Sequence, residues 1–311
     1  MPLVSVVIPV YNVEKYIRRC LTSIQQQSLS DIEIIVVNDC TPDDSISIVS
    51  ELAEKDQRIK IIDLERNEGP MIAREKGYMA ATGDYITFCD GDDYLPPLAL
   101  EKLYQAAIFY QADVVSGNMV YQRGEKELLW KSELRYGCST IGLLKSLLRR
   151  EFGHNLCSKL FKATLLHNYD YQNFSHFICG EDGYLFYQMI DKMGKVVQIE
   201  DVVYYYAYNN ESSSKRRHTR EALDNICLAN TMQIKATKAY PELETDLERC
   251  ISLSLIDLFY RGYNRDKTLS VLISKYQLNH YCSNRTIWRI YSHKECIKMF
   301  AKKYLFRKND T

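Results

Sequence analysis

Several features that would classify the chain at once are missing from its sequence. No apolar run reaches the roughly 20 residues that a membrane-spanning helix needs. The first apolar stretch, residues 3–8, is too short for the apolar region of a signal peptide and has no basic start. The formal net charge is zero, so no overall basic field favours nucleic acid. We therefore expect a cytoplasmic protein that neither spans a membrane nor binds nucleic acid.

Metal-binding and disulfide patterns are also missing among the ten cysteines. The cysteines are scattered, with no Cys-x-x-Cys motif and no paired Cys/His spacing, which argues against a zinc site and against a disulfide framework. We expect small buried thiols in a reducing compartment. The 311 residues allow one large domain or two, and a homo-oligomer stays open.

Strand and helix patterns alternate over residues 3–116. Short apolar runs predict buried strands, and the segments between them have apolar residues at helical spacing. The predicted strands are residues 3–9, 32–37, 59–64, 85–89 and 113–116, and the predicted helices are residues 14–27, 71–81, 98–110 and one that opens at 41–44. This repetition predicts an α/β fold with a Rossmann-like, mostly parallel central sheet flanked by helices on both faces.

The first strand-to-helix turn, residues 9–14, contains no glycine. Dinucleotide-dependent oxidoreductases and P-loop proteins need glycine at this turn, because their backbone must come close to the phosphates. Nucleotidyltransferases with related sheets also need a glycine-rich loop there. The sequence therefore disfavours all three classes and indicates that phosphate is held in another way, through a metal ion.

Three carboxylates follow the apolar run 85–89 within four residues: Asp90, Asp92 and Asp93. Like charges at this spacing repel unless a cation lies among them, and a hard divalent ion with oxygen ligands is the usual solution. Mg²⁺ is typically held by one or two carboxylates and by substrate phosphates, which predicts a phosphate compound as the substrate. The alternative is that Gly91 forms a turn and that the aspartates solvate it and cap the next helix.

Polar residues follow the other predicted strands as well. They are Tyr11, Asn12, Asp39, Asn67 and Arg74. Because parallel strands deliver their carboxyl ends to one side of a sheet, these residues and the aspartate cluster can share one cleft. For each residue alone a turn or capping role is the commoner one. Their joint position at successive strand ends favours a common site.

Four segments resemble, in order, the motifs of family 2 glycosyltransferases, which have the GT-A fold: residues 5–12, 36–45, 67–77 and 81–93. The resemblance covers residues 3–214. It implies that a sugar is transferred from a nucleotide donor, most often a UDP-sugar, with inversion at the anomeric carbon.

The same resemblance divides the chain. Residues 1–217 would form the GT-A domain, with a donor half at 1–118 and an acceptor half at 119–217. Residues 218–311 would form a C-terminal helical appendage. Helical periodicity is found there in residues 222–239, 243–260 and 268–276.

By resemblance, the residues that bind the nucleotide-sugar are Pro9, Tyr11, Glu14, Asp39, Asn67, Arg74, Asp90 and Gly91. Asp39 would accept a hydrogen bond from uracil N3–H, a donor that cytosine lacks. Pro9, Tyr11 and Glu14 would line the base and ribose pocket. Arg74 would approach the phosphates.

The family's Asp-x-Asp element corresponds to Asp90 and Asp92. Mn²⁺ or Mg²⁺ would be bound by Asp92 or Asp93, with Asp90 nearer the ribose, and which carboxylate touches the ion stays open. The ion would act as a Lewis acid and template for the departing diphosphate.

Inversion also needs a base that takes the proton of the acceptor hydroxyl. Residues 180–183 match the family's Glu-Asp motif, which implies Asp182 as the catalytic base, with Glu181 supporting it or contacting the acceptor. From spacing alone, the favoured explanation is an acidic helix start that is stabilised by the helix dipole.

Two further segments resemble the family with differences. Residues 155–162 resemble a segment that leads toward the acceptor, without the tryptophan expected before it; the alternative is a buried strand whose Lys159 extends its amine to solvent. In the loop that closes over the diphosphate, Ala207 and Asn209 stand where many relatives carry an arginine and a histidine. The basic residues 215–217 would supply the missing charge, or form a solvated loop.

Residues 281–311 contain eight Lys or Arg against Glu295 and Asp310, a net charge of +6. Apolar and aromatic residues interleave with these cations, and anionic membrane surfaces attract such segments. We therefore predict peripheral contact with the inner face of the cell membrane. The alternative is a surface helix with a wet cationic side.

The sequence thus predicts a metal-dependent inverting glycosyltransferase of bacterial surface-polysaccharide synthesis, such as that of capsule or lipopolysaccharide. It would move a hexose or N-acetylhexosamine from a UDP-sugar to a glycan or lipid-linked acceptor. The alternative is a non-catalytic nucleotide-sugar-binding scaffold or a partner subunit of a glycosyltransferase complex. Asp182 together with the aspartate cluster argues against that alternative. Residues 117–178 contain no legible code for the sugar, the acceptor or the linkage.

Overall fold

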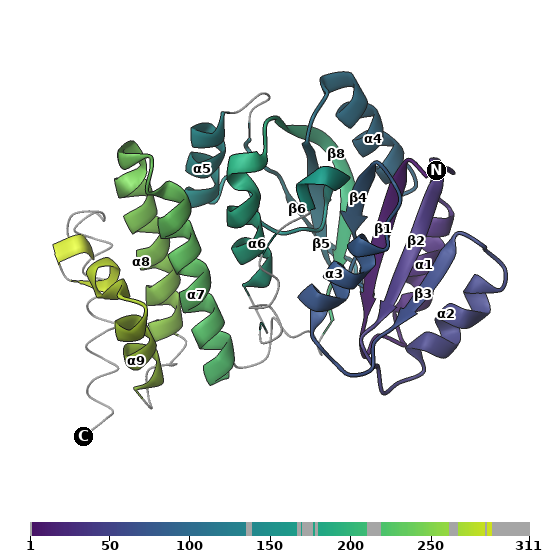
Figure 1. Cartoon of the computed structure of the whole chain (residues 1–311), viewed down its shortest axis with the longest axis horizontal. Helices are drawn as coiled ribbons and strands as arrows, with labels where there is room; N and C mark the ends of the chain where they lie inside the picture. Colours follow the sequence, from purple (N-terminus) through teal and green to yellow (C-terminus); the bar gives the residue numbers. More distant parts are fainter. Residues whose placement is uncertain are drawn as a thin grey trace.

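A computed structural model describes residues 2–134, 139–166, 169, 177, 180–209, 219–260, 267–283 and 285–287. Its centre is one eight-stranded sheet with helices on both faces (Figure 1). A further group of helices lies to one side of the sheet and its covering helices.

The N-terminal part consists of parallel strands connected by helices. In chain order these elements are β1 (Val4–Val10), α1 (Ile17–Gln25), β2 (Ile32–Asn38), α2 (Ser45–Ala53), β3 (Ile59–Asp63), α3 (Pro70–Met79), β4 (Tyr85–Phe88) and α4 (Ala99–Tyr110). β2 and β4 pair in parallel with β1, and β3 pairs in parallel with β2. The predicted repetition of strand, helix and strand is confirmed.

The remaining strands extend the same sheet. They and the neighbouring helices are β5 (Val114–Arg123), β6 (Lys126–Trp130), α5 (Thr140–Leu148), β7 (Lys159–Lys162), α6 (Glu181–Met189) and β8 (Val196–Ala207). The strand order is β3-β2-β1-β4-β7-β5-β6, and β8 pairs in parallel with β5 outside this path. β6 and β7 run antiparallel to their neighbours, so the sheet is mixed but mostly parallel, as predicted.

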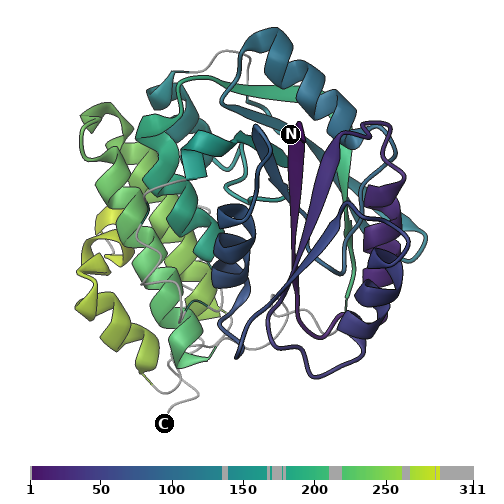
Figure 2. The same ribbon diagram turned by 45° about the vertical axis from the view of Figure 1, so that its right-hand side comes forward.

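Alternating side chains along the strands build two apolar layers. Val6 and Ile8 of β1 face the layer formed by α1, α2 and α4, whereas Val7 faces the layer formed by α3, α5 and α6. Figure 2 shows α1 and α2 on one side of the strands and α3 on the other. Strands that are buried on both faces need nearly continuous apolar sequence, which β1 and β2 provide.

The C-terminal helices pack beyond α5 and α6. They are α7 (Arg220–Thr237), α8 (Glu244–Tyr260) and α9 (Thr268–Lys275), and short 3-10 helices lie at Ala163–Leu166, Ile190–Lys192, Pro241–Leu243 and Leu278–Cys282. Leu223 and Ile251 belong to the same buried cluster as Phe186 of α6, so this cluster runs across the domain boundary predicted at residues 217 and 218. That boundary remains a prediction.

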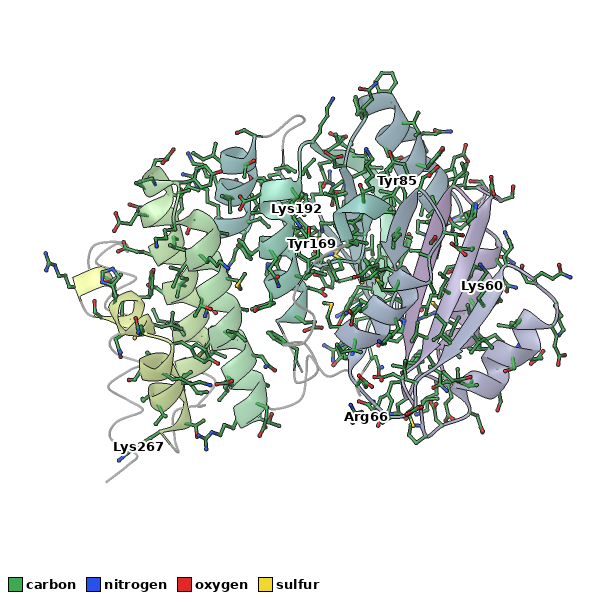
Figure 3. All side chains as sticks on the ribbon, viewed as in Figure 1. Lys60, Arg66, Tyr85, Tyr169, Lys192 and Lys267 are labelled. Carbon is green, nitrogen blue, oxygen red and sulfur yellow. The ribbon has the colours of Figure 1, made fainter. Side chains whose placement is uncertain are left out.

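Exposed cationic side chains lie toward both ends of the molecule. In Figure 3, Lys60 lies on β3, Arg66 lies below α3, and Lys267 lies at the opposite end of the molecule beside α9. Within the described residues, no helix is both long and apolar enough to cross a membrane.

The predicted elements agree with the structure to within a few residues at most of their ends. The strand predicted at residues 113–116 is longer, because β5 continues to Arg123 in a hairpin with β6. Most of the described cysteines are buried, as expected: Cys20, Cys89, Cys157, Cys227 and Cys250. Cys40 is exposed and Cys282 is partly exposed.

Candidate active site

The strand order brings several strand ends to one edge of the sheet. β1 lies between β2 and β4, and all three strands are parallel. Asp39 follows β2 and Asp90 follows β4, so the two carboxylates flank the end of β1. Ligands of open α/β sheets bind at such an edge.

Asp93 is turned into the protein. Its side chain accepts hydrogen bonds from the Tyr204 hydroxyl at 2.7 Å and from the backbone N–H of Ala207 at 2.8 Å. Asp93 is 1% exposed, and this burial, together with the charges of Asp92 and Asp90, raises its pKa. Both oxygens of Asp93 are therefore engaged in holding the loop against β8. Of the two candidate metal ligands, Asp92 is the better placed.

Asp92 is only partly buried. Its carboxylate accepts a hydrogen bond from the Asn209 side-chain amide at 3.1 Å, and its backbone carbonyl accepts one from the Arg19 guanidinium at 2.7 Å. Burial and the nearby charge of Asp90 raise the pKa of Asp92. A cation beside Asp90 and Asp92 would relieve this repulsion.

A divalent metal ion fits this pair of carboxylates if a phosphate group completes its ligands. Among the residues that the structure describes, no group of three or more His, Cys, Asp and Glu side chains could hold a metal ion by itself. Mg²⁺ needs only one or two carboxylates when substrate phosphates supply further oxygens. The donor set therefore suits an ion that binds together with a diphosphate. Gly91 is buried between the two aspartates.

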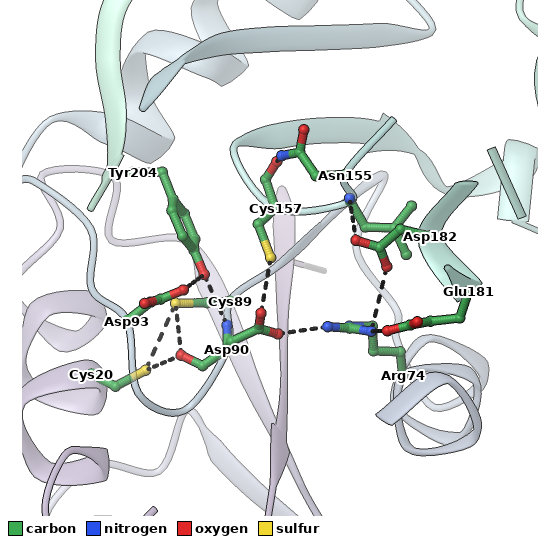
Figure 4. Close-up of polar contacts among 11 residues, drawn as sticks. Cys20, Arg74, Cys89, Asp90, Asp93, Asn155, Cys157, Glu181, Asp182 and Tyr204 are labelled. Atoms are coloured by element: carbon green, nitrogen blue, oxygen red, sulfur yellow. Dashed lines mark hydrogen bonds and ion pairs between the residues drawn. The ribbon is translucent and has the colours of Figure 1, made fainter. Parts of the chain in front are cut away.

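Arg74 connects the aspartate cluster to the predicted base (Figure 4). Its Nη2 donates to Asp90 Oδ1 at 2.7 Å, and its Nη1 lies 3.6 Å from Asp182 Oδ1 and 3.8 Å from Glu181 Oε1. Burial opposes the charge of Arg74, but these carboxylates outweigh burial and raise its pKa. Its Nε and Nη1 are buried and have no hydrogen-bond partner among the described residues.

Close packing of α3 on the sheet places Arg74. A Cβ atom at Gly77 would lie 2.3 Å from Cγ1 of Val7 and 3.1 Å from Cγ2 of Val37, so a larger residue would push the helix outward. α3 begins after a loop that Asp39 holds, since Asp39 accepts hydrogen bonds from the backbone N–H groups of residues 68 and 69 at 2.7 and 3.0 Å.

Asp39 is 2% exposed in this arrangement. Burial raises its pKa, although the two backbone hydrogen bonds oppose that effect. Each carboxylate oxygen can accept a second hydrogen bond. Both oxygens of Asp39 already accept a backbone hydrogen bond, so the contact with uracil N3–H stays a prediction.

The loop after β1 carries the other predicted base and ribose contacts. The backbone N–H of Asn12 donates to Thr41 Oγ1 at 2.8 Å, and that of Glu14 donates to Asp43 Oδ2 at 2.9 Å, so this loop is tied to the loop after β2. Of the predicted ligand residues, Tyr11, Glu14 and Asn67 are exposed, and Pro9 and Asp90 are partly exposed.

α6 presents two carboxylates in its first turn. It begins after Gly180, whose φ of +84° is rarely adopted by other residues. Asp182 Oδ2 accepts a hydrogen bond from the backbone N–H of Leu156 at 3.2 Å, and Oδ1 has no hydrogen-bond partner among the described residues. Burial and the charge of Asp182 raise the pKa of Glu181 to about 7. Such perturbed carboxylates are typical of active sites.

Two residues of the site were not identified from the sequence. The Cys157 thiol donates to Asp90 Oδ2 at 3.5 Å, and the Tyr204 hydroxyl accepts from the Asp90 backbone N–H at 3.1 Å. The signals for them were the family resemblance of residues 155–162 and of the loop at residues 204–217.

The alternative that Lys159 extends its amine to solvent is wrong. Lys159 is 0% exposed, and its Nζ donates to the carbonyl of Asn155 at 2.8 Å. Its Nζ lies 4.9 Å from the ring centre of Phe152 and 5.9 Å from that of Phe186. Residues 215–217, predicted to supply charge for the diphosphate, lie outside the described residues.

Comparison with known proteins confirms the family predicted from the sequence. A family model for glycosyl transferase family 2 matches residues 5–171, which is more than half of the chain. The chain belongs to glycosyl transferase family 2. The predicted transferase class is therefore confirmed at the level of the family.

Two curated relatives share part of their sequence with this chain. Glycosyltransferase GlyA of Streptococcus pneumoniae is 34% identical over 223 residues, which cover 68% of this chain and 31% of GlyA. Poly(ribitol-phosphate) beta-glucosyltransferase of Bacillus spizizenii is 29% identical over 279 residues, which cover 87% of this chain and 42% of that protein. The chain spans less than half of the length of either relative.

A solved structure confirms the GT-A fold. The crystal structure of S. aureus TarS 1-349 in complex with UDP-GlcNAc matches with a TM-score of 0.62 at 17% identity, covering 90% of this chain and 92% of that chain. At this identity the likeness concerns the fold alone.

Proposed function

We propose that the chain transfers a hexose or N-acetylhexosamine from a UDP-sugar to a hydroxyl group of a glycan or lipid-linked acceptor, with inversion and with a divalent metal ion. The observation that carries the proposal is the position of Arg74, which pairs with Asp90 at 2.7 Å and lies 3.6 Å from Asp182. The carboxylate predicted to contact the donor and the carboxylate predicted to act as the base thus both lie beside the guanidinium group of Arg74.

Asp182 is the base in this proposal. Its Oδ2 accepts a hydrogen bond from the backbone N–H of Leu156. Oδ1 is buried and has no hydrogen-bond partner among the described residues, and it would take the proton of the acceptor hydroxyl when the acceptor binds beside it. Glu181, beside it, would contact the acceptor. Arg74, whose guanidinium group pairs with Asp90, would approach the phosphates of the donor.

The donor would lie along the edge formed by β1, β2 and β4. Asp39 and Tyr11 would bind the uracil base, and Asp90 and Asp92 would hold Mn²⁺ or Mg²⁺. When bound, the ion neutralises charge on the departing diphosphate. Two similar proteins support this substrate class: TarS was crystallised with UDP-GlcNAc, and the Bacillus spizizenii relative is a poly(ribitol-phosphate) beta-glucosyltransferase.

Replacement of Asp182 by asparagine tests the proposal. We expect Asp182→Asn to lower UDP release from UDP-glucose and UDP-GlcNAc in the presence of acceptor by at least about 100-fold, because proton abstraction is lost. Binding of UDP should be unchanged. Asp191→Asn is the matched control, since Asp191 is exposed just after α6.

Retained transfer by Asp182→Asn would refute the assigned base. A wild-type protein that binds UDP but turns over no donor would instead favour the non-catalytic scaffold.

A further inference from the structure

Lys159 has a buried amine to which the mechanism above gives no task. It is 0% exposed, and no carboxylate in the described part of the chain forms an ion pair with it. Burial lowers the pKa of Lys159 to about 7, against the attraction of Cys157 and Asp182. An apolar side chain of similar length would fill the same space without the desolvation of an ammonium group. The position therefore favours a role beyond packing.

The amine of Lys159 binds the segment before β7. Nζ donates to the backbone carbonyl of Asn155 at 2.8 Å and to its Oδ1 at 3.2 Å. Because Nζ donates to Oδ1, the amide nitrogen of Asn155 faces the other way and donates to the carbonyl of Cys157 and, at 3.3 Å, to Ser158 Oγ. These hydrogen bonds hold residues 155–158 in a compact loop around the amine of Lys159.

This loop, which we call the 155–158 loop, contacts both functional carboxylates. The backbone N–H of Leu156 donates to Asp182 Oδ2 at 3.2 Å, and the thiol of Cys157 donates to Asp90 Oδ2 at 3.5 Å (Figure 4). Arg74 binds Asp90 through its other oxygen and lies near the other oxygen of Asp182. The loop and Arg74 therefore fix the two carboxylates from opposite sides.

The conformation of the loop needs support. Ser158 has a φ of +61°, which residues other than glycine adopt only when their surroundings hold them there. Lys159 is the next residue, and it also faces Phe186 of α6, the helix that carries Asp182.

We propose that Lys159 is a positioning residue for the transfer reaction: its side-chain amine holds the 155–158 loop in the conformation that orients Asp182 and Asp90. The proposal rests on the proposed function, since it takes Asp182 as the base. A base displaced by about 1 Å loses on the order of 100-fold in rate, although the donor still binds.

Lys159→Met separates positioning from folding. We expect its kcat to fall by about 100-fold, while the dissociation constant for UDP stays unchanged. Its Tm should change little, because the removal of a desolvated amine offsets the loss of its hydrogen bonds to Asn155. The matched control is Lys162→Met on the same strand, whose side chain is 50% exposed and which should keep the wild-type kcat.

Asn155→Ala breaks the same connection at a half-buried position and serves if Lys159→Met does not fold. It should also lower kcat with UDP binding intact, and the double variant should lose little more than either single one. Wild-type kcat in Lys159→Met, or a loss of UDP binding and Tm in step with kcat, would overturn the proposal. Transfer retained by Asp182→Asn would instead overturn the assigned base, so the two failures are distinguishable.

Discussion

At the scale of single residues, the surroundings of each carboxylate decide whether it holds the structure together or is accessible to a metal ion. Asp93 and Asp92 are neighbours in the sequence, yet Asp93 has both oxygens bonded to β8 and Asp92 is partly accessible. The donors to Asp93 come from Tyr204 and Ala207, more than 100 residues away. No local pattern could have distinguished the two aspartates, so the sequence left the metal ligand open.

Lys159 shows the same limit. Its sequence context allowed a strand with an amine at the surface, because a strand pattern does not show how its side chains are covered. Phe152 and Phe186, which enclose the amine, come from segments on either side of β7 in the sequence. Burial of a long cation is therefore a tertiary property.

Glu181 predicts a pH dependence of stability. Its pKa is about 7 in the folded protein, against an ordinary 4.5. Between these values the folded state holds more protons than the unfolded state, so this group makes the free energy of unfolding fall as pH rises from 4.5 to 7, by at most about 1.4 kcal/mol per pH unit. Glu181→Gln should lack this contribution. Denaturant titrations at several pH values measure it, and parallel pH profiles for the two proteins would contradict it.

At the scale of elements, the sequence predicted the type of an element wherever the pattern of apolar residues within that element was sufficient. The apolar runs of β1 and β2 and the helical spacing of α1 predicted their types and nearly their ends. The antiparallel insertion of β7 between β4 and β5 was not predictable, because strand pairing depends on distant partners.

The close packing of α3 on β1 at Gly77 gives a prediction about stability. Gly77→Ala would place a Cβ 2.3 Å from Cγ1 of Val7, so we expect the free energy of unfolding to fall by about 1–3 kcal/mol. Transfer should fall as well, because α3 carries Arg74. Val7→Ala removes the methyl group concerned, so the double variant should be more stable than the sum of the single effects. Strict additivity in thermal unfolding would show that the close approach is not the cause.

At the scale of the whole molecule, the sheet, α6 and the C-terminal helices share buried apolar residues. The site residues on α6 are therefore supported by helices that lie outside the segment matched by the family model. Periodicity predicted these helices but not their contacts.

The basic C-terminal segment gives a prediction about membranes. Residues 288–311 lie outside the described residues, and with the preceding residues from 281 they carry a net charge of +6. We expect the full chain to bind phosphatidylglycerol vesicles but not neutral ones, less strongly at high salt. A chain that ends at residue 287 should lose this binding in a sedimentation assay. Equal binding by both chains would contradict the prediction.

The central claim is that the edge formed by β1, β2 and β4 binds a UDP-sugar with a metal ion. Calorimetric titration of UDP, with GDP and CDP as comparison nucleotides, tests it in Mn²⁺ and then in a chelator. We predict UDP binding that needs the metal, is weakened in Asp92→Asn and is unchanged in Asp182→Asn. Absence of nucleotide binding, or UDP binding that neither the chelator nor Asp92→Asn affects, would contradict the account.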